Sequence, residues 1–573
     1  MNQAHASSYP APWSRVHTVG NSSPRECAAE ACRRSAKERL GSVAGLTHPL
    51  LERSMKNIAS TPRPSTIDSA KSRNRVWKRA AVSVLATAAL LAAATVGVPA
   101  PLNAATPAAT ATATSIACNP LPFNLPAPAN RHQSAKKAWA YYFPPFPLAV
   151  DSPDATRDVY PRWMNTHSAV SGAYDLRDRP VAPQRAASQT TWRQADFEKE
   201  VRQAVGAGLD GFIWEYHSSS DIRWQQLPAM LAAAKAVDPG FKIMLSPDFN
   251  TAAGSTSDSV YNNVMKVKDD ASIYRNNAGI VLAPFFPERK TPQWWDGLRN
   301  RLAASGVKSN LVPIFISWGG GTQKTDWNNS VSGYSQWGTR TASGVKTLAK
   351  ESAEAHRRGK TYMQPVAFED SRSYDGRYWE SSNSSTLRDS LASAISSNAD
   401  SIALMTWNDY TESWVAPSKQ RGHAVLDMAA YYISWFKNGV KPAITQDALY
   451  WSHRSHPTSA PYSKTTVGRN GKPAPMYIPN GDAAKNEVEL VAVLKTPGRL
   501  TITQGSNVKS MDAPAGLTSF KVPLVAGTTP SFKLVRGGTT VRTMTSDTPV
   551  RSSVVYQDMI YRAGGGVAAN CAR

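Results

Sequence analysis

Short apolar runs alternate with amphipathic helical patterns over residues 137–457, and this alternation limits the folds open to the chain more than any other feature. Each run is typical of a strand buried on both faces, since it is short and lacks a helical period. The runs are residues 138–143, 211–216, 241–246, 279–285, 310–317, 361–368, 401–406 and 448–452. The helical patterns are residues 197–207, 228–237, 257–267, 292–304, 344–358, 386–396 and 425–436. This alternation predicts the α/β class and a (β/α)8 barrel, which we place at residues 131–457. An open doubly wound sheet is the alternative, but no glycine-rich phosphate turn follows any strand.

The pattern of hydrophobic and turn-forming residues changes after residue 457. Short segments of alternating hydrophobicity lie between Gly and Pro turns, which is typical of a β-sandwich. These segments are residues 486–493, 498–504, 518–524, 531–535 and 539–543. We therefore predict a C-terminal β-sandwich module at residues 458–573. It either binds carbohydrate or forms a collar packed on the barrel, and no row of aromatic residues decides between these roles.

The N-terminal part of the chain differs from the rest. Residues 1–79 are rich in Ser, Ala and Arg without sustained apolar periodicity, which predicts a disordered basic region. A basic run then leads into an apolar segment and small residues, so residues 80–104 are typical of a secretory signal peptide. Residues 80–98 are also long enough to span a membrane, and an anchored protein is the alternative to a secreted one. Residues 105–130 are interpreted as a linker, because the first part of this range consists mainly of Ala, Thr and Pro.

The formal net charge is +23, and it is distributed over the whole chain. The first 79 residues contribute 14 Lys and Arg against 5 Asp and Glu. The remaining positive charge is spread out, with no basic run interleaved with aromatic residues, which argues against nucleic-acid binding. Attraction to an anionic cell wall fits this distribution better. We expect a monomer.

The four cysteines fall into two pairs. Cys27 and Cys32 precede the signal segment, whereas Cys118 and Cys571 bracket the exported part of the chain. In an oxidising compartment the second pair predicts a disulfide bond, with two free thiols as the alternative. The spacing of the cysteines fits no metal site, and we expect neither a metal nor another cofactor.

Polar and aromatic residues follow the ends of the predicted strands. In a barrel these ends gather at one mouth, where active sites lie. The candidates for substrate binding there are Tyr142, Glu215, His217, Asp248, Trp318, Glu369 and His453. Carboxylates and aromatic rings in one cleft suit a carbohydrate, because sugars present hydroxyl groups and an apolar ring face. Glu215 and Asp248 could also act in the chemistry itself, and Glu369 with Asp370 could instead be a solvated loop pair. The two histidines have no metal-binding spacing.

The segment at residues 401–413, SIALMTWNDYTES, holds the strongest candidates for catalysis. Its apolar first half predicts a buried strand, which ends in two acids, Asp409 and Glu412. The neighbouring Trp407, Asn408 and Tyr410 are further candidates for substrate binding. A glycosidase needs two carboxyl groups across the scissile bond, and residues three apart in a tight turn could supply both. Mutual repulsion and the neighbouring rings would raise one pKa, so that one acid stays protonated. The spacing does not say which is the acid and which is the base. Alternatively, the two residues only cap a helix.

The WNDYTES run resembles the WNDYGES-type motif of glycoside hydrolase family 71, the endo-α-1,3-glucanases or mutanases. Further segments resemble that family in the expected order, namely GLDGFIWEY, FKIMLSPDFN, YMQPVAF and YWSHRSHP. The resemblance spans roughly residues 137–457, and the C-terminal module is similar in placement. It implies a (β/α)8 barrel with a β-sandwich, inverting hydrolysis of α-1,3-glucosidic bonds, and Asp409 and Glu412 as the catalytic pair. Thr411 stands where the family usually has Gly.

Two alternatives remain open at this point. The sequence is also similar to the endo-α-mannosidases of family 99, whose corresponding strand ends in a WNE-type segment, so α-mannan is a second candidate substrate. A non-catalytic glycan-binding protein of the cell wall is the other alternative. The acid pair favours an enzyme, because a binding protein has no need of two acids so close together.

Overall fold

The computed structural model describes residues 120–144, 146, 160–164, 176–181, 192–250, 256–316, 322, 324–467 and 473–568. The expectations for residues 1–104, for Trp318 and for a bond between Cys118 and Cys571 lie outside these residues. Within the described ranges, no helix has the length and apolar composition needed to cross a membrane.

The end of the predicted linker is packed rather than free. Leu121 and Phe123 are buried in the main hydrophobic core, and Phe123 forms an antiparallel β-bridge with Ile444. The short 3-10 helix Pro128–Asn130 follows. The boundary predicted at residue 130 is therefore wrong, because two apolar side chains in the preceding segment belong to the folded core.

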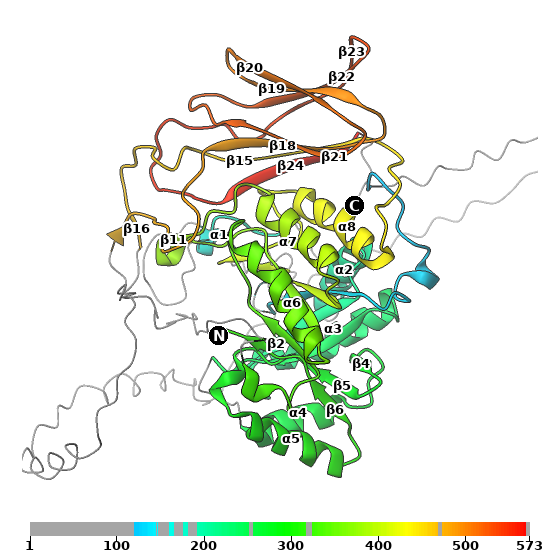
Figure 1. The fold of residues 1–573 in the computed structure, drawn as a ribbon. Coiled ribbons are helices and arrows are strands. Elements are labelled where there is room, and N and C mark those ends of the chain that lie inside the picture. The colour runs from blue at the N-terminus through cyan, green and yellow to red at the C-terminus, as the bar shows by residue number, and fades with distance from the viewer. Residues whose placement is uncertain are drawn as a thin grey trace, which may run out of the picture. The chain divides into compact units, whose positions relative to one another are not determined.

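A curled, mostly parallel sheet forms the centre of the molecule (Figure 1). Its strands are β1 (Lys137–Tyr142), β2 (Gly211–Tyr216), β3 (Lys242–Pro247), β4 (Arg275–Asn276), β5 (Gly279–Leu282), β6 (Ser309–Leu311), β7 (Ile314–Phe315), β8 (Gly333–Gln336), β9 (Thr361–Val366) and β12 (Ser401–Leu404). The order is β4-β5-β3-β2-β1-β12-β9-β8-β7, and only the β4–β5 pair is antiparallel. Because β6 pairs with β5 while β7 pairs with β8, the single segment 309–315 is bonded to the second strand from each end of this order.

Helices follow most of the strands, as the sequence predicts. They are α1 (Tyr160–Met164), α2 (Trp192–Gly206), α3 (Ile222–Val237), α4 (Ser257–Val267), α5 (Pro292–Ala304), α6 (Leu348–Arg357), α7 (Ser385–Ser396) and α8 (Ala424–Asn438). Local chemistry fixes several of the ends: the side chains of Asp221, Thr256 and Thr291 accept backbone N–H bonds at the starts of α3, α4 and α5. Helix α8 ends at Gly439, which has φ 74°.

Alternate residues of the longer parallel strands enter two different apolar clusters. Trp139, Tyr141 and Ile213 pack inside the curl of the sheet. Ala138, Tyr142 and their equivalents face outward and join the core formed with the helices. This alternation follows from the pleat of a strand, which sends successive side chains to opposite faces. It also fixes which residues beyond the strand ends continue the inner face.

One predicted strand is in the wrong place. The run at 448–452 is β15 (Ala448–Arg454), which lies in an antiparallel sheet with β18 (Glu487–Leu494) and β24 (Tyr561–Val567), not in the parallel sheet. The parallel sheet uses β8 instead, whose sequence GYSQ carries no apolar run and was not predicted. Every residue of β15 is buried, and this gives it the same continuous apolar signal as a barrel strand.

The C-terminal region forms two separate four-stranded antiparallel sheets. The first has the order β21-β18-β15-β24, with β21 at Gly516–Pro523. The second has the order β20-β19-β22-β23, with bounds Asn507–Ala513, Gly498–Gln504, Ser531–Arg536 and Thr539–Thr545. Leu490 of the first sheet and Ile502 of the second belong to one apolar cluster. The other face of the first sheet, including Tyr450 and Val491, joins the main core, and β24 contacts α8 (Figure 1).

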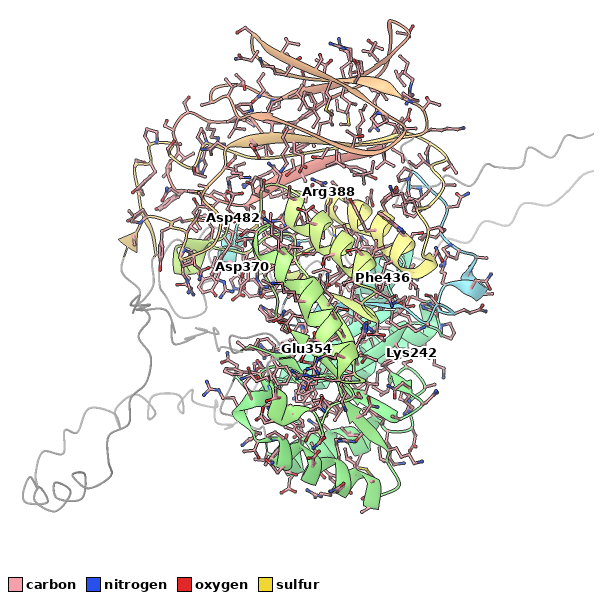
Figure 2. The ribbon with its side chains drawn as sticks, viewed as in Figure 1. Lys242, Glu354, Asp370, Arg388, Phe436 and Asp482 are labelled. Atoms are coloured by element: carbon pink, nitrogen blue, oxygen red, sulfur yellow. The ribbon has the colours of Figure 1, made fainter. Side chains whose placement is uncertain are left out.

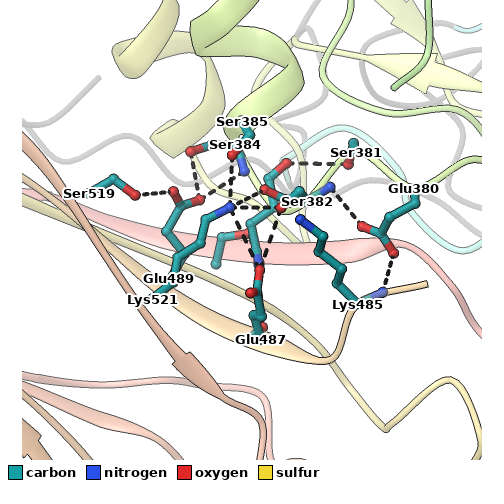
Figure 3. A network of polar contacts seen from close by, with 12 residues as sticks. Glu380, Ser381, Ser382, Ser384, Ser385, Lys485, Glu487, Glu489, Ser519 and Lys521 are labelled. Carbon is teal, nitrogen blue, oxygen red and sulfur yellow. Dashed lines mark hydrogen bonds and ion pairs between the residues drawn. The ribbon is translucent and has the colours of Figure 1, made fainter. Parts of the chain in front are cut away.

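A buried polar network ties the first C-terminal sheet to the start of α7 (Figure 3). Glu489 of β18 accepts hydrogen bonds from the Ser384 backbone N–H at 2.8 Å and hydroxyl at 2.7 Å, and from the Ser519 hydroxyl at 2.6 Å. Arg388 of α7 pairs with the same carboxylate at 2.7 Å. Lys521 donates to the carbonyl and the hydroxyl of Ser382, at 2.7 and 2.9 Å. The C-terminal sheets are thus bonded to the part of the chain that carries the parallel sheet.

Candidate active site

The segment after β12 folds back as a hairpin. Strand β13 (Asn408–Asp409) pairs with β14 (Ser413–Trp414), so residues 410–412 form the turn. The Thr406 hydroxyl accepts from the Asp409 backbone N–H at 2.8 Å and donates to the Ser413 carbonyl at 2.6 Å. Helix α8 begins only at Ala424. The alternative that Asp409 and Glu412 cap a helix is therefore wrong, and both acids lie on a tight turn at the carboxyl end of a parallel strand.

Asp409 lies in a surrounding that favours its protonated form. Its side chain is buried and accepts hydrogen bonds from the backbone N–H of Thr411, at 3.0 Å, and from the Thr411 hydroxyl. Burial, and then the negative charge of Glu412, raise the pKa of Asp409 well above its usual value, and the bonds from Thr411 only partly oppose this.

Glu412 differs from Asp409 in its partners. Arg372 pairs with Glu412 Oε2 at 2.8 Å, and the Tyr374 hydroxyl donates to Oε1 at 3.0 Å. The Ser371 backbone N–H also donates to the Glu412 carbonyl at 2.9 Å. Burial raises the pKa of Glu412 above its usual value, and the charge of Arg372 reduces that rise without cancelling it. The ion pair therefore favours the ionised form of Glu412, whereas Asp409 has no ion pair among the described residues.

A third carboxyl group, that of Asp370, and a second arginine, Arg340, complete this group. Asp370, labelled in Figure 2, is fully buried; it accepts from Arg372 Nε and Nη2, both at 2.8 Å, and from Arg340 Nε at 2.9 Å. Although burial opposes ionisation, Arg372 and Arg340 lower the pKa of Asp370 to about 2. The alternative of a solvated loop pair for Glu369 and Asp370 is wrong, since both side chains are buried.

A second polar cluster follows β2 and β3. Glu215 lies two residues after the inward-facing Ile213, and Asp248 follows β3 on the same inner face. His217 Nε2 lies 2.7 Å from Glu215 Oε1 and 3.3 Å from Asp248 Oδ2, and Arg223 Nε donates to Glu215 Oε2 at 3.0 Å. Burial acts against a charged ring, but the two carboxylates outweigh it and raise the pKa of His217 to about 9.

The same three residues meet the distance requirement of a metal site. One ligand atom from each of Glu215, His217 and Asp248 lies within 4.8 Å of the others. Their chemistry fits a cation poorly, because His217 is itself a cation below about pH 9 and Arg223 already neutralises Glu215. Charged groups that offer both donors and acceptors instead suit the hydroxyl groups of a sugar.

The two clusters lie at the same end of the sheet. Asp409 follows β12 and Glu215 lies near the end of β2, and β1 runs between these strands, parallel to both. Two interstrand spacings separate β12 from β2 by about 10 Å at the backbone. Trp337, just after β8, is partly exposed and packs against Tyr141 of β1 with a centroid distance of 5.0 Å. The sequence analysis missed this ring because it missed β8.

Several residues that were predicted to bind substrate instead contact the β13–β14 hairpin and its flanking residues from the side that faces away from the inside of the sheet. Tyr142 and Trp407 face outward, and both donate to Glu200 of α2, at 2.6 and 3.0 Å. Asn408 accepts from the Phe143 backbone N–H at 2.8 Å and donates to the Phe143 carbonyl at 3.0 Å. Tyr410 is buried in a separate aromatic cluster with Phe146, Tyr160 and Trp414. The side chains of these four residues therefore point away from the position that the sequence analysis expected for them.

Glu369 and His453 do not reach the mouth of the sheet. Glu369 pairs with Arg421 and accepts from the Tyr561 backbone N–H at 3.0 Å, which places it against β24. His453 belongs to β15, where its Nε2 lies 2.8 Å from the Ser546 hydroxyl oxygen. Burial lowers the pKa of His453 to about 4. The prediction for His453 failed together with the placement of its strand.

Comparison with known proteins identifies the family of the chain. The sequence model of glycosyl hydrolase family 71 matches residues 185–562. The chain belongs to glycosyl hydrolase family 71. Curated relatives include a glucan endo-1,3-alpha-glucosidase of Schizosaccharomyces pombe, 24% identical over 64% of this chain and 90% of that protein. A mutanase of Penicillium rubens is 23% identical over 65% of this chain and 86% of that protein. Among solved structures, the GH99 endo-alpha-mannosidase from Bacteroides thetaiotaomicron aligns with a TM-score of 0.42 and 14% identity, over 53% of this chain and 97% of that one.

The matched region of the family includes both catalytic candidates and nearly all of the C-terminal sheets. Residues that the sequence analysis did not single out are Arg223, Trp337, Arg340, Arg372 and Tyr374. Two of them, Arg372 and Tyr374, lie in the run FEDSRSYDGR directly after the predicted strand at residues 361–368, and this position was the sequence signal for them.

Proposed function

We propose that this family 71 protein hydrolyses α-1,3-glucosidic bonds in glucan by an inverting mechanism with two carboxyl groups. The observation that carries the proposal is the difference between Asp409 and Glu412. Burial and the charge of Glu412 raise the pKa of Asp409 well above its usual value, whereas the smaller rise at Glu412 is opposed by its ion pair with Arg372. Asp409 is therefore the group that more readily keeps its proton. An inverting glycosidase requires one carboxyl group in each state. The names of the two curated relatives support glucan as the substrate.

In this mechanism Asp409 is the general acid and Glu412 the general base. Glu412 takes a proton from water as the water oxygen attacks the anomeric carbon, and Asp409 gives its proton to the departing glycosidic oxygen. The bond to the leaving sugar breaks as the bond to water forms, so the product carries the inverted anomeric configuration. Glu215, His217 and Asp248 bind sugar hydroxyl groups, and Trp337 offers a ring face to a neighbouring sugar unit.

We also infer the finer architecture and the location of the enzyme. The pairing of segment 309–315 with both β5 and β8, which lie near opposite ends of the strand order, supports a closed (β/α)8 barrel. The shared apolar cluster of the C-terminal sheets supports a β-sandwich. Residues 80–104 support export by a signal peptide. The enzyme then acts outside the cell on a wall polysaccharide, as a monomer.

The test is release of reducing ends from insoluble α-1,3-glucan by residues 105–573. Parallel assays use α-1,4-glucan, α-1,6-glucan and α-mannan, and proton NMR follows the anomer that forms first. We expect activity on α-1,3-glucan with an inverted first product. D409N and E412Q should each lower kcat by a factor of about 10² to 10⁴.

Other results would overturn the proposal in different ways. Cleavage of α-mannan alone would give the chain another substrate. Binding of glucan without hydrolysis of any polymer would identify a glycan-binding protein. A first product with retained configuration would refute the inverting mechanism, and full activity of E412Q would remove the assigned base.

A further inference from the structure

The segment that holds Glu412 is itself unusually well fixed. Strand β10 (Ser371–Arg372) pairs with β11 (Arg377–Tyr378) in a short hairpin, and the Ser371 backbone bonds to the Glu412 carbonyl. The Arg372 guanidinium is buried and lies 5.2 Å from the centre of the Trp379 ring. Its Nε and Nη2 both bind Asp370, and Nη2 also reaches Glu412. A guanidinium held at several atoms has one orientation, and it therefore fixes the position of the Glu412 carboxylate.

The charges of this group balance only if Glu412 is ionised. Arg340 and Arg372 contribute two positive charges, and Asp370 contributes one negative charge, all three on buried side chains. Asp409 also faces this group but lies in a surrounding that favours its neutral form. A buried charge without a partner costs several kcal/mol, so the second guanidinium requires the negative charge of Glu412.

Tyr374 completes the contacts of the Glu412 carboxylate. Its hydroxyl donates to Oε1, while Arg372 binds Oε2, so each oxygen of Glu412 has one fixed donor. A carboxylate oxygen has two acceptor positions, which leaves one on each atom for a water molecule. The carboxylate is thus held in place without losing its capacity to accept a proton.

We propose that Arg372 is the positioning residue that keeps Glu412 ionised and oriented as the base, with Asp370 and Arg340 holding Arg372 in place. This inference rests on the proposed hydrolysis and deepens it, because it names the group that separates the roles of two acids three residues apart. Arg372 acts through Glu412 and need not touch the substrate.

The test compares the pH profile of kcat/KM for the parent chain, R372M, R372K and D370N. Loss of the positive charge in R372M should raise the pKa of Glu412 and move the acid limb of the profile upward by about one pH unit or more. It should also lower kcat by about 100-fold, with a much smaller change in KM. R372K keeps a charge and should recover part of both losses. D370N removes a negative charge near Glu412 and should move the acid limb in the opposite direction.

R377M is the matched control, because Arg377 lies in the same hairpin and pairs with Asp375 rather than with Glu412. Its acid limb should stay where it is in the parent. Opposite shifts in R372M and D370N cannot arise from general loss of structure, and thermal unfolding checks that each variant is folded. An active parent whose acid limb is unchanged in R372M would overturn this inference alone. A parent that hydrolyses no polymer would overturn the proposed function, and this inference with it.

Discussion

At the scale of single residues, contacts made by neighbouring side chains decide what each ionisable group can do. His217 is an example, because an isolated histidine is mostly neutral at pH 7. Here Glu215 and Asp248 raise its pKa to about 9, so the ring is a cation held between two carboxylates. A charged donor of this kind forms stronger hydrogen bonds to a sugar hydroxyl than a neutral one.

This predicts a defined effect of H217Q on substrate binding. Loss of one charged hydrogen bond should lower kcat/KM on α-1,3-glucan about 10- to 100-fold, chiefly through KM. H356Q is the control, since His356 pairs with Asp400 at 2.8 Å in a partly exposed position on α6. Steady-state kinetics on a soluble oligosaccharide would measure the change. Equal kinetic constants for H217Q and H356Q would show that the cluster does not bind substrate.

At the scale of elements, Glu200 joins helix α2 to the sheet. It accepts from Tyr142 at the end of β1 and from Trp407 just after β12, and it is buried. Burial raises the pKa of Glu200 to about 8, so the folded chain holds this carboxyl group protonated at neutral pH. The unfolded chain releases that proton above its ordinary pKa of about 4.3. The stabilisation is therefore complete below that value and is lost as the pH rises through about 8.

Thermal unfolding at several pH values tests this account. Between about pH 6 and pH 9 the contribution of Glu200 to the unfolding free energy should fall by about 2 kcal/mol. E200Q cannot ionise, so its Tm should fall less over this interval than that of the parent. E198Q is the control, because Glu198 lies on the same helix in a solvent-facing pair with Arg202. If E200Q and E198Q follow the same curve, Glu200 is not protonated in the folded state.

The strands also show where prediction from the hydrophobic pattern succeeds and where it fails. Strands such as β2 and β3, buried on both faces, have apolar sequences and were placed correctly. Strand β8 was missed because its inner face carries Gly333 and Ser335, whose hydroxyl donates to the Met363 carbonyl at 2.8 Å. Small residues fit there because the backbones approach closely: a Cβ on Gly333 would lie 2.2 Å from the Thr361 hydroxyl oxygen. Tight packing removed the apolar signal on which the prediction depended.

At the scale of the whole molecule, the first C-terminal sheet shares a hydrophobic core and a polar network with the helices that follow the strands of the parallel sheet. Strand β15 connects them to the preceding α8, and its outward-facing Tyr450 enters the main core. Glu489 is fully buried and receives four donors from α7, the segment before it and β21. Burial acts to raise the pKa of Glu489, but Arg388 outweighs burial and lowers it. The contribution of Glu489 to the unfolding free energy is therefore present above the ordinary pKa of a glutamate and is lost on acidification.

Removal of this charge should destabilise the whole chain. E489Q leaves Arg388 buried without its partner, which should cost about 3–5 kcal/mol of unfolding free energy. D512N is the control, since Asp512 and Arg499 form an exposed pair, and its effect should stay within about 0.5 kcal/mol. Calorimetry should show one transition for the parent and for E489Q, at a lower temperature in E489Q. A separate early transition in E489Q would mean that the C-terminal sheets unfold independently.

The sequence alone determined the α/β class, most helices and strands, the segment that bears the two acids, and the family. These features depend on local periodicity and on a contiguous motif, both of which can be read along the chain. The tertiary structure decided that β15 leaves the parallel sheet, that Trp407 and Tyr142 face away from the mouth, and that Arg372 reaches Glu412. It also decided how the two acids differ, because a pKa depends on burial and on charges from distant segments, and sequence distance does not encode either.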